Sequence, residues 1–153
     1  MTEASDRFVR HFRVGWGDVD GNGHMANTAF LDRAADTRFE FFAACGFPVG
    51  RFIEERVGPV IVRDELVYRK ELRLLEEFTV DLEALGLSSD GARFELGNTF
   101  HNLAGELVAS VNSGGTWFDL DRRRPRAPSA DLDAVQRKMH RSDRFKELPP
   151  RRP

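Results

Sequence analysis

The sequence predicts an α+β domain in which one antiparallel sheet packs against a single long helix. Two observations lead to this fold class: apolar residues recur at helical spacing over residues 27–45, and segments on either side alternate between apolar and polar residues. The chain has 153 residues, of which 41% are apolar. This length and composition fit one globular domain with its own core.

The first predicted strand covers residues 8–16. Its apolar side chains lie at alternate positions and would share one face of an extended chain, as in a half-buried strand. These side chains are Phe8, Phe12, Val14 and Trp16. The glycine-rich run GDVDGNGH follows and should end the strand.

The long helix is predicted from about Asn27 to Cys45. Gly46 is suited to close it, and Pro48 prevents its continuation. A short connection with helical character is expected over residues 51–56.

Four further strands are predicted at residues 58–71, 77–87, 92–103 and 106–118. Turn-forming residues separate the last three, with the run SSDG at 88–91 and LAG at 103–105. These three strands should therefore form an antiparallel meander.

The end of the chain differs in charge from the rest. Residues 1–121 hold 12 Lys/Arg and 21 Asp/Glu, whereas residues 122–153 hold 11 and 4. We therefore predict a main domain over 1–121 and a basic C-terminal extension over 122–153. Within the extension, Ser129 should cap a short helix from Ala130 to about His140, and the final PPRRP should fray.

The extension and the chain's composition set expectations for partners and compartment. Phe145 is the only aromatic residue of the basic extension, so stacking on single-stranded nucleic acid is not expected. Cys45 is the only cysteine, and the N-terminal residues lack a long apolar run. We expect a cytoplasmic protein with no membrane or nucleic-acid partner.

The densest chemistry lies in the loop from Asp18 to His24, for which three interpretations compete. The run D-x-D-x-N-G matches the start of a calcium loop. However, the closing position falls on Ala29, which has no carboxylate, and a strand precedes the loop where a helix is required. We therefore expect no metal site.

The second interpretation assigns these residues to turn and cap geometry alone. It accounts for the glycines but leaves His24 and two neighbouring carboxylates unexplained, because acids are costly to crowd unless they are solvated or used. The third interpretation is catalysis.

The catalytic interpretation is strengthened by a family resemblance. The run VGWGDVDGNGHMAN at 14–27 resembles the strand, the D-x-D-x-x-G-H motif and the helix start of hotdog-fold acyl-CoA thioesterases of the 4-hydroxybenzoyl-CoA thioesterase type. Phe30-Leu31, Thr37-Arg38 and the turn at 87–89 fit the same pattern. The resemblance covers residues 8–120. Ala26-Asn27 stands where many members carry Asn-Asn, and Phe30 where Tyr is common.

The resemblance implies a hotdog fold, in which an antiparallel sheet of about five strands wraps one long helix. It also implies an acyl-CoA substrate, no cofactor, and a homodimer or tetramer with sites between subunits. The catalytic aspartate of the family falls on Asp20, which would act as nucleophile or general base. An open sheet edge independently favours association into at least a dimer.

The chemistry of thioester hydrolysis suits this loop. A thiolate with a pKa of about 8.5 leaves without strong acid assistance, so the reaction needs mainly a carboxylate and donors for the oxyanion. Backbone N–H groups near Asn27, at the helix start, can be those donors. His24 is a candidate to orient substrate or water or to be a structural element, and Asn27 to be a helix cap or a substrate contact.

Coenzyme A phosphates require cations, and the candidates are Arg69, Lys70, Arg93 and the cluster at 122–126. Arg38 should face the sheet or a subunit contact and find a polar partner there. Two other functions stay open: a non-catalytic module that binds an acyl ligand, and an interaction protein that uses a calcium loop or the basic tail.

Overall fold

The computed structural model describes residues 6–150. The N-terminal half contains β1 (Phe8–Arg13), a 3-10 turn η1 (Trp16–Asp18), α1 (Asn27–Ala44) and α2 (Val49–Glu55). The long strands are β2 (Val57–Tyr68), β3 (Glu77–Ser88), β4 (Arg93–Asn102) and β5 (Leu107–Asp119). The C-terminal segment forms β6 (Arg124–Pro125), α3 (Ala130–Gln136) and β7 (Arg141–Leu148).

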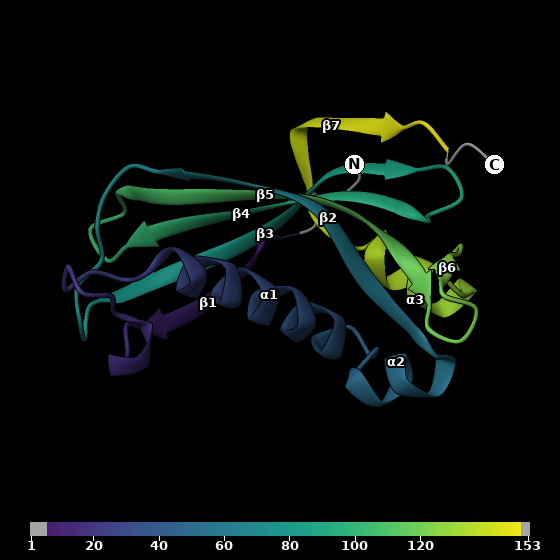
Figure 1. The fold of residues 1–153 in the computed structure, drawn as a ribbon. Helices are drawn as coiled ribbons and strands as arrows, with labels where there is room; N and C mark the ends of the chain where they lie inside the picture. Colours follow the sequence, from purple (N-terminus) through teal and green to yellow (C-terminus); the bar gives the residue numbers. More distant parts are fainter. Residues whose placement is uncertain (1–5, 151–153) are drawn as a thin grey trace.

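The strands form one sheet in the order β1-β3-β4-β5-β2, and these neighbours are all antiparallel (Figure 1). β1 pairs with the first half of β3, and β7 runs parallel to its second half. β1 and β7 thus share one edge of the sheet, while β2 forms the opposite edge.

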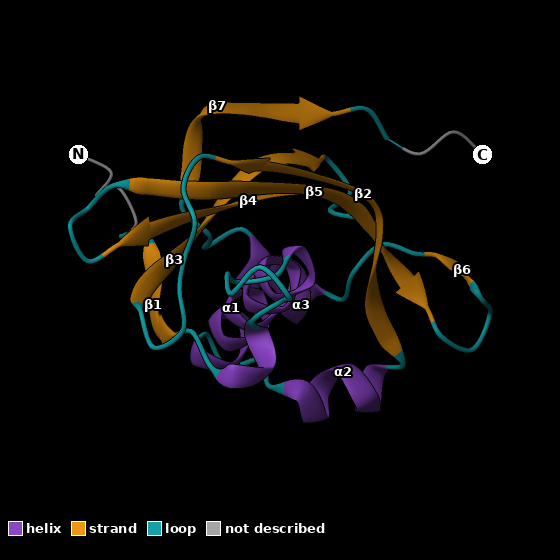
Figure 2. Ribbon diagram, turned by 60° about the vertical axis from the view of Figure 1, so that its left-hand side comes forward, coloured by secondary structure: helices purple, strands orange, loops and turns teal. Residues whose placement is uncertain are grey.

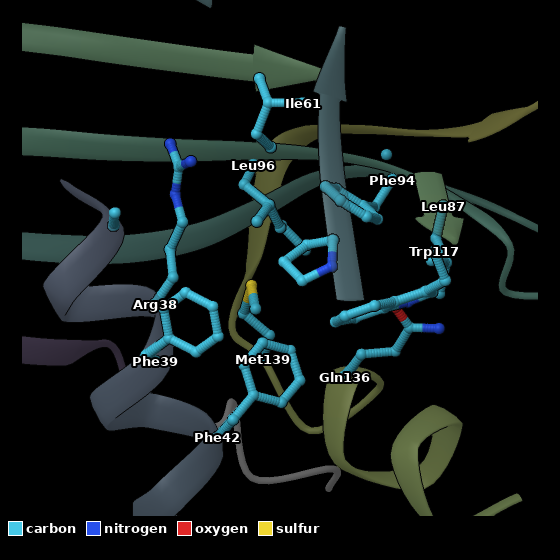
Figure 3. A pocket seen from close by; sticks show the side chains of 14 residues that line it. Arg38, Phe39, Phe42, Ile61, Leu87, Phe94, Leu96, Trp117, Gln136 and Met139 are labelled. Atoms are coloured by element: carbon cyan, nitrogen blue, oxygen red, sulfur yellow. The ribbon is translucent and has the colours of Figure 1, made fainter. Parts of the chain in front are cut away.

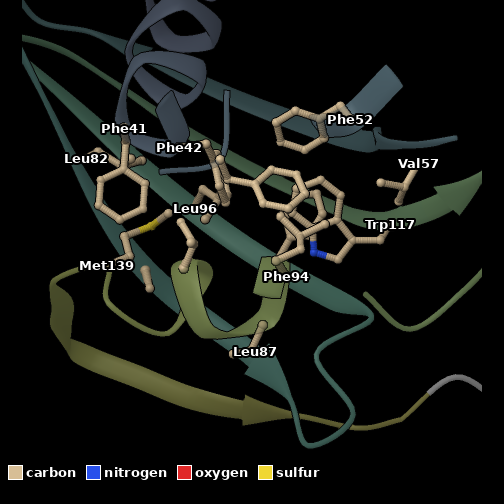
Figure 4. Close-up of a cluster of buried hydrophobic side chains, with 14 residues drawn as sticks. Phe41, Phe42, Phe52, Val57, Leu82, Leu87, Phe94, Leu96, Trp117 and Met139 are labelled. Carbon is tan, nitrogen blue, oxygen red and sulfur yellow. The ribbon is translucent and has the colours of Figure 1, made fainter. Parts of the chain in front are cut away.

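The sheet curls around α1 and α3, which lie on its concave face (Figure 2). Alternate residues of β3, β4 and β5 point toward these helices and are buried, as the period of two in an extended chain requires. One buried cluster joins the C-terminal half of α1 to α3 and the sheet, with Phe42, Phe94 and Trp117 at its centre (Figure 4). A second cluster packs around Phe30 and Phe100 near the start of α1.

The predicted long helix is confirmed almost to the residue. Gly46 ends it with a φ of 89°, a left-handed conformation that glycine adopts without steric cost. Ser129 caps α3 as predicted, since its side chain accepts a hydrogen bond from the Leu132 N–H. α3 is shorter than predicted and ends at Gln136.

The prediction that the first strand continues to Trp16 was wrong. β1 ends at Arg13, and Trp16 lies in η1 with 83% of its side chain exposed. The reason is local: the Gly15 N–H donates to the Asp18 carboxylate at 2.9 Å, which turns the chain away from the sheet.

Besides forming the predicted helix, the C-terminal segment contributes side chains to the core. Leu132, Val135 and Met139 are buried in the same cluster as the C-terminal end of α1. β7 was not predicted at all. The predicted fraying end includes residues 151–153, which lie outside the described residues. Within residues 6–150, no helix has both the length and the apolar character needed to span a membrane.

Candidate active site

The loop between η1 and α1 is held in a fixed shape by backbone hydrogen bonds. The Asp20 N–H donates to the His24 carbonyl at 2.9 Å, and the Gly23 N–H donates to the Asp20 carbonyl at 3.0 Å. Gly23 has a φ of 76°, which this tight turn requires. Beyond the turn, the Met25 N–H donates to the Leu72 carbonyl at 2.7 Å. The loop is therefore attached to the segment that follows β2.

Asp18 has a structural role in this loop. One carboxylate oxygen accepts from the Gly15 N–H, and the other accepts from Arg33 Nη2 at 2.9 Å. Both oxygens are thus engaged within the protein. For Asp18 this fits the second interpretation of the loop, in which its residues serve turn and cap geometry.

Asp20 is exposed, in contrast to Asp18. Its Oδ1 accepts one hydrogen bond, from the Asn22 N–H at 2.8 Å, and this bond fixes the orientation of the carboxylate. No ion pair of Asp20 is found among the described residues. The carboxylate is accessible and oriented, as a base or nucleophile must be.

His24 lies next to Asp20 and is paired with an acid. Its Nε2 is 2.7 Å from Glu71 Oε2, and Glu71 Oε1 in turn accepts from Arg73 Nη2 at 2.9 Å. An isolated bridge between the backbones of His24 and Arg73 brings these residues together. The imidazole is therefore held in one orientation.

α1 begins beside this loop without a side-chain cap. Ala26 occupies the N-cap position, and its side chain has no group that accepts a hydrogen bond. Asn27 is the first helical residue, so of the two roles considered for it, helix cap and substrate contact, the cap is excluded. The first N–H groups of a helix have no intrahelical acceptor, so those of Asn27 and Thr28 are available to an anionic group.

These features line one pocket of about 390 Å³. The lining residues come from the loop, the start of α1 and the end of β2. They are Asp20, Asn22, His24, Met25, Asn27, Phe30, Tyr68, Arg69, Lys70 and Glu71. Five of the six residues predicted for the site therefore meet in one place.

Tyr68 was not predicted, although it is the only tyrosine of the chain. Its ring packs edge-on against Phe30, with centroids 5.4 Å apart. Partial burial raises the pKa of the Tyr68 hydroxyl further above its ordinary value of about 10, so the hydroxyl is neutral at pH 7 and can donate a hydrogen bond. Its position directly before Arg69 and Lys70 was the available sequence signal. Glu71, directly after Lys70, carried the same signal, but its pairing with His24 follows only from the folded chain.

The predicted cations fall into two groups. Arg69 has no ion pair within residues 6–150, and Lys70 Nζ is 2.5 Å from Glu106 Oε2. Both line the pocket. Arg93 does not line it. Arg93 pairs with Thr116 on β5, whereas the Lys70 N–H bonds to Val108, eight residues earlier on β5. Eight residues of a strand span roughly 25 Å. Arg93 Nη1 instead donates to the Pro149 carbonyl at 2.7 Å.

The arginines at 122–126 also lie away from this pocket. Arg126 Nη1 donates to the Glu55 carbonyl, and the Arg123 guanidinium lies over the Phe118 ring. Arg38 faces the sheet as predicted, with Nε donating to Asn98 Oδ1 at 2.9 Å and Nη2 to Ser113 Oγ at 2.7 Å.

The chain belongs to the thioesterase-like superfamily, whose family model matches residues 14–147. No curated protein matched it. The described fold and the family match confirm the predicted hotdog fold and family resemblance.

Solved structures share the fold at low sequence identity. A hypothetical protein of Staphylococcus aureus, solved in complex with CoA, has a TM-score of 0.80 at 19% identity, covering 90% of this chain and 85% of that one. A 1,4-dihydroxy-2-naphthoyl-CoA thioesterase from Synechocystis has a TM-score of 0.75 at 14% identity, with coverages of 85% and 95%. A gentisyl-coenzyme A thioesterase has a TM-score of 0.73 at 21% identity, with coverages of 81% and 98%.

Proposed function

We propose that this protein hydrolyses an acyl-CoA thioester to the free acid and CoA, with Asp20 as nucleophile or general base. One observation carries the proposal: an exposed, oriented carboxylate and the uncapped start of α1 line the same pocket. The family, and the CoA ligand and CoA-thioester substrates named for similar structures, support the same reaction.

The start of α1 supplies stabilisation for the oxyanion. As the carbonyl carbon is attacked, negative charge develops on its oxygen, and preorganised N–H donors lower the energy of that state. The N–H groups of Asn27 and Thr28 are such donors, and the helix dipole adds to their effect. The thiolate of CoA then leaves without a strong acid.

The remaining pocket residues would position the substrate. His24, held by Glu71, and the neutral Tyr68 hydroxyl can hydrogen-bond the thioester or the attacking water. Arg69 and Lys70 at the pocket wall suit the phosphates of CoA.

The test is thiol release from acetyl-, dodecanoyl- and benzoyl-CoA by the wild-type protein and by Asp20→Asn. We expect the variant to lose at least about a hundredfold in kcat/KM, the lower range for a positioned acid or base. Asp18→Asn is the matched control, because the same change affects a carboxylate that contacts Gly15 and Arg33 rather than substrate. Circular dichroism verifies that each variant is folded. Wild-type activity in folded Asp20→Asn would refute the assignment.

The same assay separates the two other functions. Acyl-CoA binding without thiol release would favour a non-catalytic ligand-binding module. A calcium loop is disfavoured by the geometry, because both oxygens of Asp18 are already bonded within the protein.

A further inference from the structure

A second pocket lies between α1, the sheet and the C-terminal segment, at the opposite end of α1 from Asp20. It has a volume of about 250 Å³. Protein interiors contain few voids larger than a water molecule, and a cavity of about 150 Å³ is already large enough to hold benzene. A space of this size is therefore large enough for an organic ligand.

The walls of this pocket are mostly carbon. Phe39 and Phe42 come from α1, Phe94 and Trp117 from the sheet, and Met139 from the segment after α3 (Figure 3). Most of the lining is deeply buried, whereas Phe39 is 39% and Ile61 36% exposed. The pocket thus opens between α1 and the edge strand β2.

The polar side chains of the lining are already bonded to the protein. Trp117 Nε1 donates to Gln136 Oε1 at 2.9 Å, and Gln136 Nε2 donates to the Gly91 carbonyl at 2.9 Å. Arg38 Nε and Nη2 are bonded to Asn98 and Ser113. An aryl hydroxyl or the amides of pantetheine would lose their water partners here without gaining these groups. An aliphatic chain has no such cost.

The pocket is placed to receive one end of a ligand held at the start of α1. Leu31, half-buried, lies one helical turn from Asn27 and one turn from Ala35, which lines the pocket. Eight residues separate Asn27 from Ala35, which is about 12 Å along the helix axis. An extended carbon chain covers this distance in about nine carbons, from C–C bonds of about 1.5 Å.

We propose that this pocket binds the distal part of a fatty acyl chain, so that the preferred substrate is an aliphatic acyl-CoA of about ten to sixteen carbons. The reaction itself rests on the proposed function, whereas the ligand class follows from the pocket. The far wall is made by Gln136 and Met139 of the C-terminal segment, so that segment limits the chain length.

The experiment measures kcat/KM for straight-chain acyl-CoAs from butyryl to palmitoyl. Each buried methylene is worth about fourfold, so dodecanoyl-CoA should exceed butyryl-CoA by at least about a hundredfold. Ala35→Phe fills the pocket mouth and should reduce that ratio at least about tenfold. Met139→Ala enlarges the far end and should shift the optimum to longer chains.

The matched control is Ala44→Phe, which introduces the same side chain on the same helix at an exposed residue outside the pocket. It should leave the chain-length profile unchanged within about twofold. A flat profile in the wild-type protein, or equal effects of Ala35→Phe and Ala44→Phe, would overturn the proposal.

Binding of dodecanoate, measured by calorimetry on the full chain, separates this proposal from the proposed function. If dodecanoate binds and Ala35→Phe abolishes binding, while no thioester is cleaved, the fatty acyl site is supported and the proposed hydrolysis is refuted. If acetyl- or benzoyl-CoA is cleaved but dodecanoate does not bind, the enzymatic function stands and the fatty acyl site is refuted.

Discussion

Asp18 and Asp20 are separated by one residue but have opposite surroundings. Asp18 holds the chain at Gly15 and Arg33, whereas Asp20 accepts a single backbone hydrogen bond and faces a pocket. A carboxylate whose oxygens are both bonded in the native state stabilises the fold, and one that retains an open oxygen can react. The structural role of Asp18 and the proposed reactive role of Asp20 therefore follow from the groups that lie near each side chain after folding.

Arg69 and Arg93 give a direct test of where the nucleotide part of CoA binds. We expect Arg69→Ala to raise KM for acyl-CoA about tenfold, because a charge-assisted contact to phosphate is lost, while kcat is unchanged. The same variant should have a normal KM for an acyl-N-acetylcysteamine thioester, which has no phosphates.

Arg93→Ala is the control, since Arg93 lies at the other end of the sheet. The Arg69→Ala effect should shrink at high salt, where the contact is screened. Equal KM increases in both variants would contradict the assignment.

For single residues, the sequence was sufficient to predict those members of the candidate site that lie close together along the chain. Asp20, His24 and Asn27 occupy one short run, and Arg69 and Lys70 are adjacent. The sequence did not reveal that Glu71 pairs with His24, because an isolated backbone bridge between His24 and Arg73 brings the two segments together. It offered Arg93 on charge alone, and charge carries no information on which end of a strand faces the pocket.

The turn between β3 and β4 shows how one element is stabilised by a local carboxylate. Asp90 Oδ1 accepts from Ser88 Oγ at 2.7 Å and from the Ala92 N–H at 3.1 Å. Chiefly the hydrogen bond from Ser88 lowers the pKa of Asp90 below its ordinary value. Because the folded-state pKa is depressed, the stabilisation is present above the unfolded-state pKa and disappears as pH falls through the folded-state pKa.

Asp90→Ala should therefore reduce the free energy of unfolding by about 0.5–1 kcal/mol at pH 7, a value kept small by solvent screening. The difference from wild type should shrink below about pH 4. Urea unfolding of Asp90→Ala and wild type, at pH 7 and below about pH 4, measures this difference in the free energy of unfolding. Asp143→Ala, on an exposed residue of β7, should have little effect at either pH. A constant Asp90→Ala difference across pH would show that the loss is steric rather than electrostatic.

Elements with strong periodicity were predictable, and β7 was not. β3 has apolar residues at alternate positions over much of its length, next to clear turn signals, so its bounds follow from the sequence. Five of the eight residues of β7 are charged, and only its last residue is buried. Its strand conformation comes from pairing with β3, a tertiary interaction without local signature.

The whole molecule has one edge strand that is unusually open. β2 is 12 residues long and, within residues 6–150, pairs only with β5. It exposes several apolar side chains, with Val62 76%, Tyr68 45% and Val67 37% exposed. Long open edge strands with unpaired backbone groups pair with other chains, so we expect a homodimer formed through β2. Tyr68 and the mouth of the apolar pocket would then lie near the partner subunit.

Light scattering should give a mass of twice 17.4 kDa or more for the wild-type protein. Val62→Asp places a charge near the middle of β2, where a two-fold axis would bring two copies together, and should produce a monomer with greatly reduced activity. Ile53→Asp, on an exposed residue of α2, is the control and should keep the wild-type mass. A fully active wild-type monomer would rule out a site completed between subunits.

The arrangement of β7 bears on how far such association can proceed. A sheet with two open edges can bind further copies at both edges, and such an assembly can grow into a fibre without limit. Here part of one edge is formed by β7, whose five charged residues are all exposed. Pairing with another copy would remove water from these charges, and this desolvation cost opposes pairing there. β7 would thus block growth at this edge, and association would stop once the β2 edges of two copies had paired.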